Sequence, residues 1–168
     1  MSRRFLMCPP TFFDVTYAIN PWMALDVAVD RDLAVEQWDA LRRTYELLGH
    51  KIDVVEPVEG LPDMVFTANA GTVIGGKVLP ARFRHEERRG EEEPYRRWFT
   101  DHGWFAVAGE VPVNEGEGDF LLAGDVLLSG TGFRTDPAAR GYTPHPLPMG
   151  ELRKAGGAVK CCTLELRD

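Results

Sequence analysis

PDMVFTANAGTVIGGKVLP, residues 62–80, holds three short apolar runs in close succession, at Met64–Phe66, Thr72–Ile74 and Val78–Pro80. Gly75-Gly76 separates the second run from the third, and a glycine pair between two short apolar runs is typical of a β-hairpin. The stretch therefore predicts short strands joined by a tight turn.

Strands and one long helix alternate before this stretch. A first strand is expected at Arg4–Met7, and a second at Ile52–Val55. Between them, the irregular segment 11–29 has a length that is typical of lids and binding loops. Asp30 is the expected N-cap of a helix that ends at Gly49. The helix shows one apolar stripe, formed by Ala34, Trp38, Leu41, Tyr45 and Leu48.

After the hairpin, the segment Arg82–Arg97 is densely charged, which predicts a solvated helix face anchored at its end by Trp98 and Phe99. A short helix is expected at Glu151–Lys154. Further strands are expected at Trp104–Val107, Phe120–Ala123, Val126–Ser129 and Ala158–Leu166. This order predicts an α/β fold, and 168 residues fit a single domain.

Composition excludes several classes of function. The net charge of −7 argues against a nucleic-acid surface, and no apolar stretch has the roughly 18 residues of a membrane span. The N-terminus does not resemble a secretory signal. Three cysteines without a Cys-x-x-Cys spacing suit the reducing cytoplasm. No metal is expected, because the histidines are scattered, at His50, His85, His102 and His145.

Polar residues gather in three glycine-rich or tight-loop segments: 62–69, 114–119 and 156–161. The last ends in Cys161, beside Lys160, which would favour the thiolate. A cysteine nucleophile with a pair of carboxylates suits a planar guanidinium, because the acids bind its N–H groups while the thiolate attacks its carbon. Simpler alternatives remain for each residue: a buried inert cysteine, a turn cap at Asp63, a surface ion pair at Arg134 and an Asx turn at Asp119.

Five motifs occur together and in order: Asp63-Met-Val-Phe-Thr-Ala-Asn69, Pro80-Ala-Arg-Phe-Arg-His-Glu-Glu-Arg-Arg89, Glu115-Gly-Glu-Gly-Asp119, Gly132-Phe-Arg-Thr-Asp136 and Gly156-Gly-x-x-x-Cys161. Taken together they resemble the dimethylarginine dimethylaminohydrolases of the guanidino-modifying (amidinotransferase) superfamily. The resemblance implies the pentein fold, an α/β propeller of ββαβ units around a central site. It also implies hydrolysis of dimethylarginine to citrulline and dimethylamine without a cofactor or metal.

The resemblance also implies roles for individual residues. Cys161 would be the nucleophile and Cys162 its neighbour. Glu115 would act beside it and, with Asp63, would hold the guanidinium, for which Glu117 is the alternative. The other substrate-binding residues would be Asn69 of the first motif, and Arg88 and Arg134, whose guanidinium groups would bind the substrate carboxylate.

The chain departs from the family in one respect. The family carries a His-Leu-Asp segment between its Phe-Arg-Thr motif and its cysteine, whereas here only 26 residues separate Arg134 from Cys161 and none form that segment. We therefore expect an internal deletion near residues 139–142, which joins N-terminal units 1–139 to a nucleophile segment 140–168 and leaves the propeller incomplete.

Rival functions are an arginine deiminase, an amidinotransferase, or a non-catalytic remnant that binds guanidino ligands or a partner chain. The expected partner is a small guanidino molecule, with a homo-oligomer or a completing partner chain as further alternatives.

Overall fold

The computed structural model describes residues 2–106, 113–118, 120–123, 126–129, 150–155 and 161–167. Its strands are β1 (Arg4–Met7), β2 (Lys51–Val54), β3 (Gly71–Ile74), β4 (Lys77–Pro80), β5 (Phe105–Ala106), β6 (Phe120–Ala123), β7 (Val126–Ser129) and β8 (Leu164–Leu166). Its α-helices are α1 (Arg31–Leu47), α2 (Glu86–Arg89), α3 (Glu92–Asp101) and α4 (Gly150–Arg153). The described residues also form three 3₁₀ helices: η1 (Pro62–Val65), η2 (Thr67–Ala70) and η3 (Gly116–Gly118).

The helix α1 forms where the sequence predicts it. Asp30 caps its start, because a carboxylate oxygen of Asp30 accepts a hydrogen bond of 3.0 Å from the backbone N–H of Leu33. Gly49, at a φ of 83°, follows its end. The apolar stripe faces inward except at its C-terminal end, where Tyr45 is half-buried and Leu48 is exposed. The helix connects β1 to β2, which pair in parallel as expected for a β–α–β unit.

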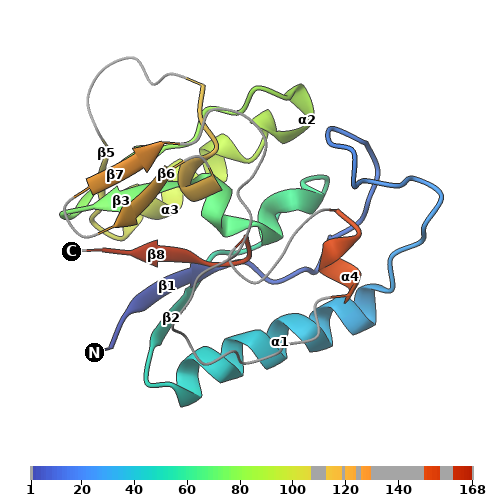
Figure 1. Ribbon diagram of the computed structural model, residues 1–168, viewed down its shortest axis with the longest axis horizontal. Helices are drawn as coiled ribbons and strands as arrows, with labels where there is room; N and C mark the ends of the chain where they lie inside the picture. Colours follow the sequence, from blue (N-terminus) through green and yellow to red (C-terminus); the bar gives the residue numbers. More distant parts are fainter. Residues whose placement is uncertain are drawn as a thin grey trace.

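The first sheet has the order β2-β1-β8, so the N-terminal strand lies between two partners that are distant in sequence. The strand β8 runs antiparallel to β1, with Arg4 opposite Leu166, which brings the two ends of the chain to the same side of the molecule (Figure 1). Cys161 and Cys162 lie in a turn before β8 rather than inside a strand as predicted.

The second sheet contains the predicted hairpin. The strands β3 and β4 pair antiparallel around Gly75-Gly76, whose φ angles are 56° and 72°. After α2 and α3 the chain returns as β5, parallel to β4, which completes a ββαβ unit. The run Met64–Phe66 was predicted with the strands, and that prediction is wrong: Pro62 begins a 3₁₀ helix there. Because this helix is buried on all sides, its apolar run does not reveal its period.

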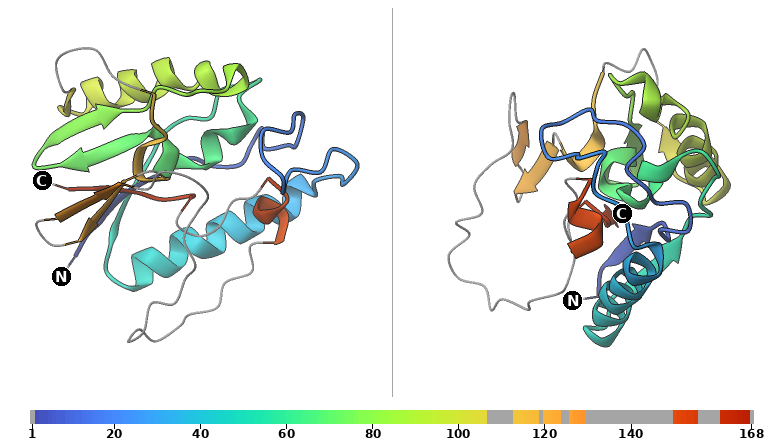
Figure 2. Two further views of the ribbon diagram at one scale, coloured as in Figure 1. Left: turned by 45° about the horizontal axis from the view of Figure 1, so that its top comes forward. Right: turned by 90° about the vertical axis from the view of Figure 1, so that its right-hand side faces the viewer.

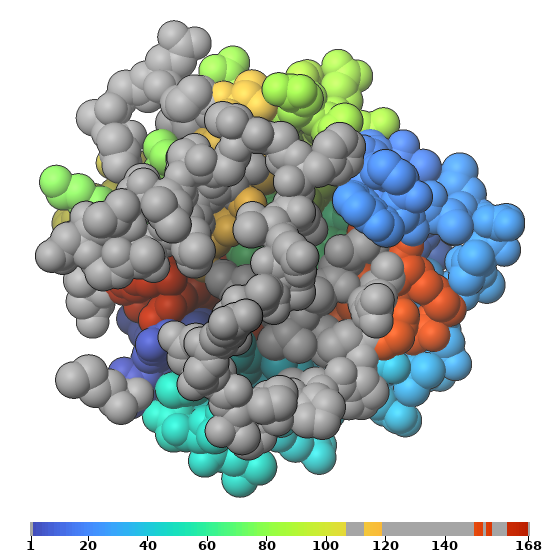
Figure 3. Space-filling model, in the orientation of Figure 1, coloured from blue at the N-terminus to red at the C-terminus, as the bar shows by residue number. Residues whose placement is uncertain are grey.

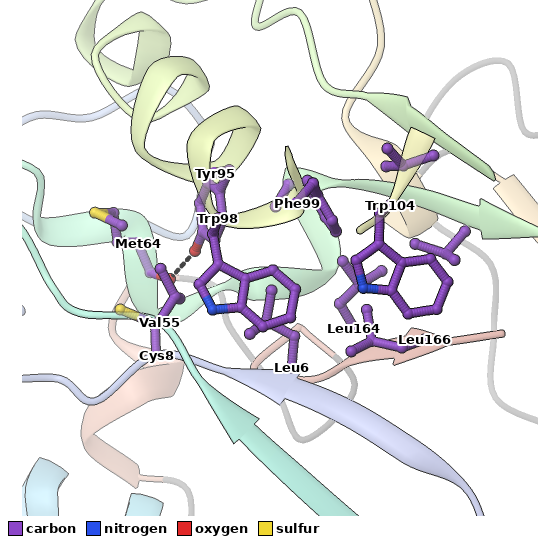
Figure 4. Close-up of a cluster of buried hydrophobic side chains, with 13 residues drawn as sticks. Leu6, Cys8, Val55, Met64, Tyr95, Trp98, Phe99, Trp104, Leu164 and Leu166 are labelled. Atoms are coloured by element: carbon purple, nitrogen blue, oxygen red, sulfur yellow. Dashed lines mark hydrogen bonds between the residues drawn. The ribbon is translucent and has the colours of Figure 1, made fainter. Parts of the chain in front are cut away.

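Two clusters of apolar side chains form the core, and they lie on opposite sides of the β1–β8 layer. Figure 2 shows α3 on one side of the strands and α1 on the other. On the α3 side, Tyr95 is fully buried and its hydroxyl donates to the backbone oxygen of Met64 (Figure 4). The same cluster includes Trp98, Phe99, Leu6, Leu164 and Leu166. Both faces of the first sheet are therefore covered.

The α/β class is confirmed. The described strands form three separate sheets, of which the third is the antiparallel pair β6-β7, and they do not close into a ring. Among the helices that the structure describes, none is both long enough and apolar enough to cross a membrane.

Candidate functional site

Asp63 lies at the second position of η1 and is only 2% exposed. Its Oδ2 accepts a hydrogen bond of 3.0 Å from the hydroxyl of Tyr17 and lies 3.8 Å from Nε of Arg88. Its Oδ1 is buried too, and it accepts no hydrogen bond from any group that the structure describes. The Asp63 side chain is therefore not a turn cap but a buried carboxylate with acceptor capacity to spare.

The groups around Asp63 shift the pKa of its carboxyl in opposite directions. Burial raises the pKa of the Asp63 carboxyl, the positive charge of Arg88 and the hydrogen bond from Tyr17 lower it, and the negative charge of Glu115 raises it. The pKa is raised overall. Any cation that bound to this carboxylate would oppose the effect of burial.

Arg88, beside Asp63, is only 4% exposed, and its guanidinium is surrounded by acceptors. It forms a two-pronged pair with Glu91, with an Nε–Oε1 distance of 2.9 Å and an Nη2–Oε2 distance of 2.8 Å. Its Nη1 donates to Oδ1 of Asn69 at 3.2 Å, and its Nη2 also reaches the backbone oxygen of Asp63 at 3.4 Å. Phe83 packs on the guanidinium at 4.4 Å. Arg88 thus holds both Asp63 and Asn69 in place, and its contact with a substrate carboxylate stays a prediction.

Asn69 connects this ion pair to the loop that carries Glu115. Its side-chain Nδ2 donates to the backbone oxygen of Glu115 at 3.3 Å. The two glycines that follow Glu115 permit this approach. A Cβ on Gly116, which has a φ of 55°, would stand 2.5 Å from the backbone oxygen of Gly71, and a Cβ on Gly118 would stand 2.6 Å from Nδ2 of Asn69. The glycines of the Glu-Gly-Glu-Gly motif therefore let the loop of Glu115 pack closely against the buried group formed by Asp63, Asn69, Arg88 and Glu91, the Asp63 cluster.

The two acids of that motif go to different places. The charge of Glu115 acts on Asp63, Arg88 and Glu91, which places it with the buried cluster. The carboxylate of Glu117 is bound by Arg167, just after β8. Of the two predicted alternatives for holding a guanidinium, Glu115 is the one that the structure brings next to Asp63.

Cys161 approaches the same cluster from the other end of the chain. Its backbone oxygen accepts a hydrogen bond of 3.1 Å from the N–H of Ala68, the residue before Asn69. Its side chain is half-buried, whereas Cys8 and Cys162 are fully buried. Burial, together with nearby negative charge, raises the pKa of both buried thiols. Cys161 is therefore the cysteine of the three that reagents can reach.

Several predicted residues lie outside the part of the chain that the structure describes: Arg134, Asp119, Lys160 and His145. Two residues that sequence reasoning missed join the cluster instead, Tyr17 and Glu91. Tyr17 comes from the irregular segment that was expected to be a lid or binding loop. Glu91 lies within Arg82–Arg97, and the prediction of a solvated face is wrong for Arg88 and Glu91, because both turn inward to form a pair.

An open hollow of about 420 Å³ lies on another part of the surface. It is lined by residues of β1, of the β3–β4 turn and of the segment after α3, among them Arg4, Lys77, His102 and Trp104. The Asp63 cluster does not contribute to its lining.

The sequence of this chain is similar to the sequences of known enzymes. No family model matches the sequence. The chain is 49% identical over 138 residues to the N(G),N(G)-dimethylarginine dimethylaminohydrolase of Mycobacterium tuberculosis, a match that covers 82% of this chain and 45% of the relative. It is 45% identical over 146 residues to the bifunctional arginine dihydrolase/ornithine cyclodeaminase AgrE of Nostoc, covering 83% of this chain and 20% of AgrE.

Solved structures agree with these matches. A crystal structure of AgrE with ornithine and NAD+ superposes with a TM-score of 0.88 at 29% identity, over 98% of this chain and 39% of that one. The N-terminal domain of ArgZ, a cyanobacterial arginine dihydrolase, was solved as a C264S mutant bound to substrate. It superposes with a TM-score of 0.74 at 43% identity, over 81% of this chain and 51% of that one. The matched part of the chain thus spans less than half the length of each of these two curated relatives. Across that span, it belongs to the dimethylarginine dimethylaminohydrolase family of the guanidino-modifying superfamily.

Proposed function

We propose that this chain provides the guanidinium site of a hydrolase that converts dimethylarginine to citrulline and dimethylamine. One observation carries the proposal: Asp63 is a buried carboxylate whose Oδ1 has no donor among the described residues, in a cluster with Glu115 and near the turn of Cys161. A guanidinium supplies the planar N–H donors that such carboxylates accept. The identity with the mycobacterial relative supports the choice of substrate.

The chemistry follows from the groups present. Asp63 and Glu115 would accept N–H groups of the bound guanidinium, while the Cys161 thiolate adds to its central carbon. The carbon–nitrogen bond to dimethylamine then breaks, and the amine leaves with a proton. Water adds to the same carbon, the carbon–sulfur bond breaks, and citrulline and the free thiolate remain. Both the departure of the amine and the attack of water need a proton carrier.

The described histidines that can be placed by their contacts do not serve that purpose. His102 stacks on Trp98 at 4.1 Å between ring centroids, and its Nδ1 lies 2.8 Å from the backbone oxygen of Trp98. His50 packs against Phe5, and its Nδ1 accepts from the N–H of Arg3. We therefore propose that a second chain supplies the histidine.

Arginine is the second candidate substrate, because AgrE and ArgZ are both named as arginine dihydrolases at more than 40% identity. The two activities differ in the leaving group, which is dimethylamine in one case and ammonia in the other. Assays of citrulline, dimethylamine and ammonia release from both compounds, with Cys161→Ser as control, test the choice. The proposed function would be rejected if the chain neither hydrolysed nor bound either compound.

Two further residues have proposed roles at the far end of the substrate. Arg134 would bind the α-carboxylate directly. Arg88 is the second proposed carboxylate partner, although its present contacts favour a supporting role through Asn69. Glu117, bound by Arg167, is a weaker candidate for the guanidinium than Glu115.

We also propose that residues 1–168 form one domain, with 1–139 and 140–168 as its two parts, and that it is an incomplete α/β propeller. The ββαβ unit from β3 to β5 and the 39% share of the AgrE structure that the chain covers support this. A second copy or a partner chain would complete the ring.

Three free cysteines, two of them deeply buried, fit a reducing cytoplasm.

A further inference from the structure

The entry loop, residues 8–30 between β1 and α1, is fastened to the rest of the molecule at several points. Phe13 and Met23 are buried in the core cluster on the α1 side. The N–H of Asp30 donates to the Glu151 carboxylate at 2.7 Å, which ties the loop to α4. Figure 3 shows the blue surface of this loop next to the orange-red surface of α4. The loop is therefore anchored both to the core and to α4.

One contact joins the entry loop to the candidate site. The half-buried Tyr17 donates its hydroxyl to Oδ2 of Asp63 at 3.0 Å. The positive group near this carboxylate is Arg88, whose Nε lies 3.8 Å from Oδ2 but donates its hydrogen bond to Glu91. Among the described residues, Tyr17 is thus the hydrogen-bond donor to the Asp63 side chain.

The two oxygens of the Asp63 carboxylate differ in their hydrogen bonding. Oδ2 is engaged by Tyr17, while Oδ1 accepts nothing from the described residues. A hydrogen bond to one oxygen restrains the rotation of a carboxylate, so the other oxygen presents its lone pairs in a narrower range of directions.

We propose that Tyr17 is a positioning residue, whose hydroxyl holds Asp63 so that Oδ1 faces the guanidinium of the substrate, and which thereby couples the entry loop to substrate binding. This inference rests on the proposed function. Tyr17 acts through Asp63 and need not touch the reacting atoms.

The groups that face Asp63 determine how the proposal can be tested. They are Tyr17 from the entry loop, Arg88 from α2, Glu91 from the α2–α3 junction and Glu115 from the loop before η3. The hydrogen bond from Tyr17 stabilises the charged carboxylate, so its loss raises the pKa of Asp63 further. A carboxylate must be ionised to bind a guanidinium. Removal of the hydroxyl should therefore weaken binding most at low pH, where loss of the negative charge adds to loss of the orientation, and less at high pH, where only the orientation is lost.

Calorimetry with asymmetric dimethylarginine, from about pH 5 to about pH 9, measures this, with Cys161→Ala in every protein to prevent turnover. The Tyr17→Phe variant should move the acid limb of the affinity profile upward by about one pH unit, which is about tenfold in affinity on that limb. Tyr45→Phe is the matched control, because it removes another hydroxyl, one that lies 3.4 Å from Thr163 Oγ1. The control should leave the profile in place.

The outcomes distinguish the positioning role of Tyr17 from the guanidinium site itself. Asp63→Asn should weaken binding throughout; if it binds like the parent, or if the parent does not bind, the proposed function fails. If Asp63→Asn weakens binding but Tyr17→Phe either matches the parent or weakens it equally at every pH, the positioning role of Tyr17 is overturned while the guanidinium site stands.

Discussion

Arg88 and Glu91 form a two-pronged ion pair in the interior, with N–O distances of 2.9 and 2.8 Å, and the two side chains are 5% and 0% exposed. The pair lies between the 3₁₀ helices that carry Asp63 and Asn69 and the helix α3. Its burial costs desolvation energy, which the two parallel hydrogen bonds and the contact with Asn69 offset. The pair is therefore expected to contribute mainly to the stability of the folded protein.

Breaking this pair should destabilise the protein strongly. Glu91→Ala would leave Arg88 charged and buried without its main partner, and the free energy of unfolding should fall by about 3–5 kcal/mol. Urea denaturation measures the change. Glu93→Ala is the matched control, because Glu93 pairs with Arg96 at the same spacing on the surface, where such a pair contributes at most about 1 kcal/mol. Equal losses in the two variants would contradict the role of the buried pair.

Gly116→Ala should disturb the loop of Glu115. The glycine has a φ of 55°, and an added Cβ would stand 2.5 Å from the backbone oxygen of Gly71, so the loop must move away from β3. Gly76→Ala is a useful control, since its φ of 72° imposes backbone strain but nothing lies within 4 Å of the new Cβ. Strain alone costs about 1–2 kcal/mol, and Gly116→Ala should cost more in thermal or urea unfolding. It should also weaken dimethylarginine binding, whereas the control should not.

Local signals explain which elements the sequence could predict. The helix α1 has its cap and most of its apolar stripe within one segment, and the β3–β4 hairpin has Gly75-Gly76 at its turn. Neither depends on distant residues. The run Met64–Phe66 was mistaken for a strand because burial on all sides gives an apolar run with no period.

The candidate site was only partly predictable for the opposite reason. Asp63, Asn69 and Glu115 could be picked out through their motifs, but the contact of Tyr17 with Asp63 joins residues 46 positions apart and has no local pattern. Arg88 and Glu91 lie in a segment whose charge predicts exposure. Their burial is decided by the acceptors and the Phe83 ring that surround them, which appear only once the chain has folded.

Cys161 should react with alkylating reagents faster than the other two cysteines. Its side chain is half-buried, while Cys8 and Cys162 are fully buried and burial raises the pKa of their thiols, so little thiolate is available from either. Limited treatment with iodoacetamide, followed by peptide mass analysis, measures the three rates. Labelling should appear first at Cys161 and at the other positions only after unfolding in urea. Early labelling of Cys8 or Cys162 in the folded protein would contradict the assignment of the nucleophile.

The purified chain alone should turn over slowly or not at all. A general acid–base histidine contributes about 10²–10⁴-fold, and here the departing amine and the attacking water each need one. His50 and His102 are engaged by backbone and aromatic partners away from that role. Cys161 could still be alkylated once by a reactive amidine such as a chloroacetamidine, in which the sulfur displaces chloride, because that step needs only the thiolate and a carboxylate to hold the cation.

The expected result is therefore a single covalent adduct on Cys161, seen by intact mass, without steady release of citrulline. Asp63→Asn should slow formation of the adduct, because it removes the carboxylate that holds the amidinium. Mixing with a chain that carries the missing histidine should restore turnover. Steady citrulline production by the 168-residue chain alone, abolished by Cys161→Ser, would contradict the prediction. Replacement of His85, His102 and His145, one at a time, would then identify the base.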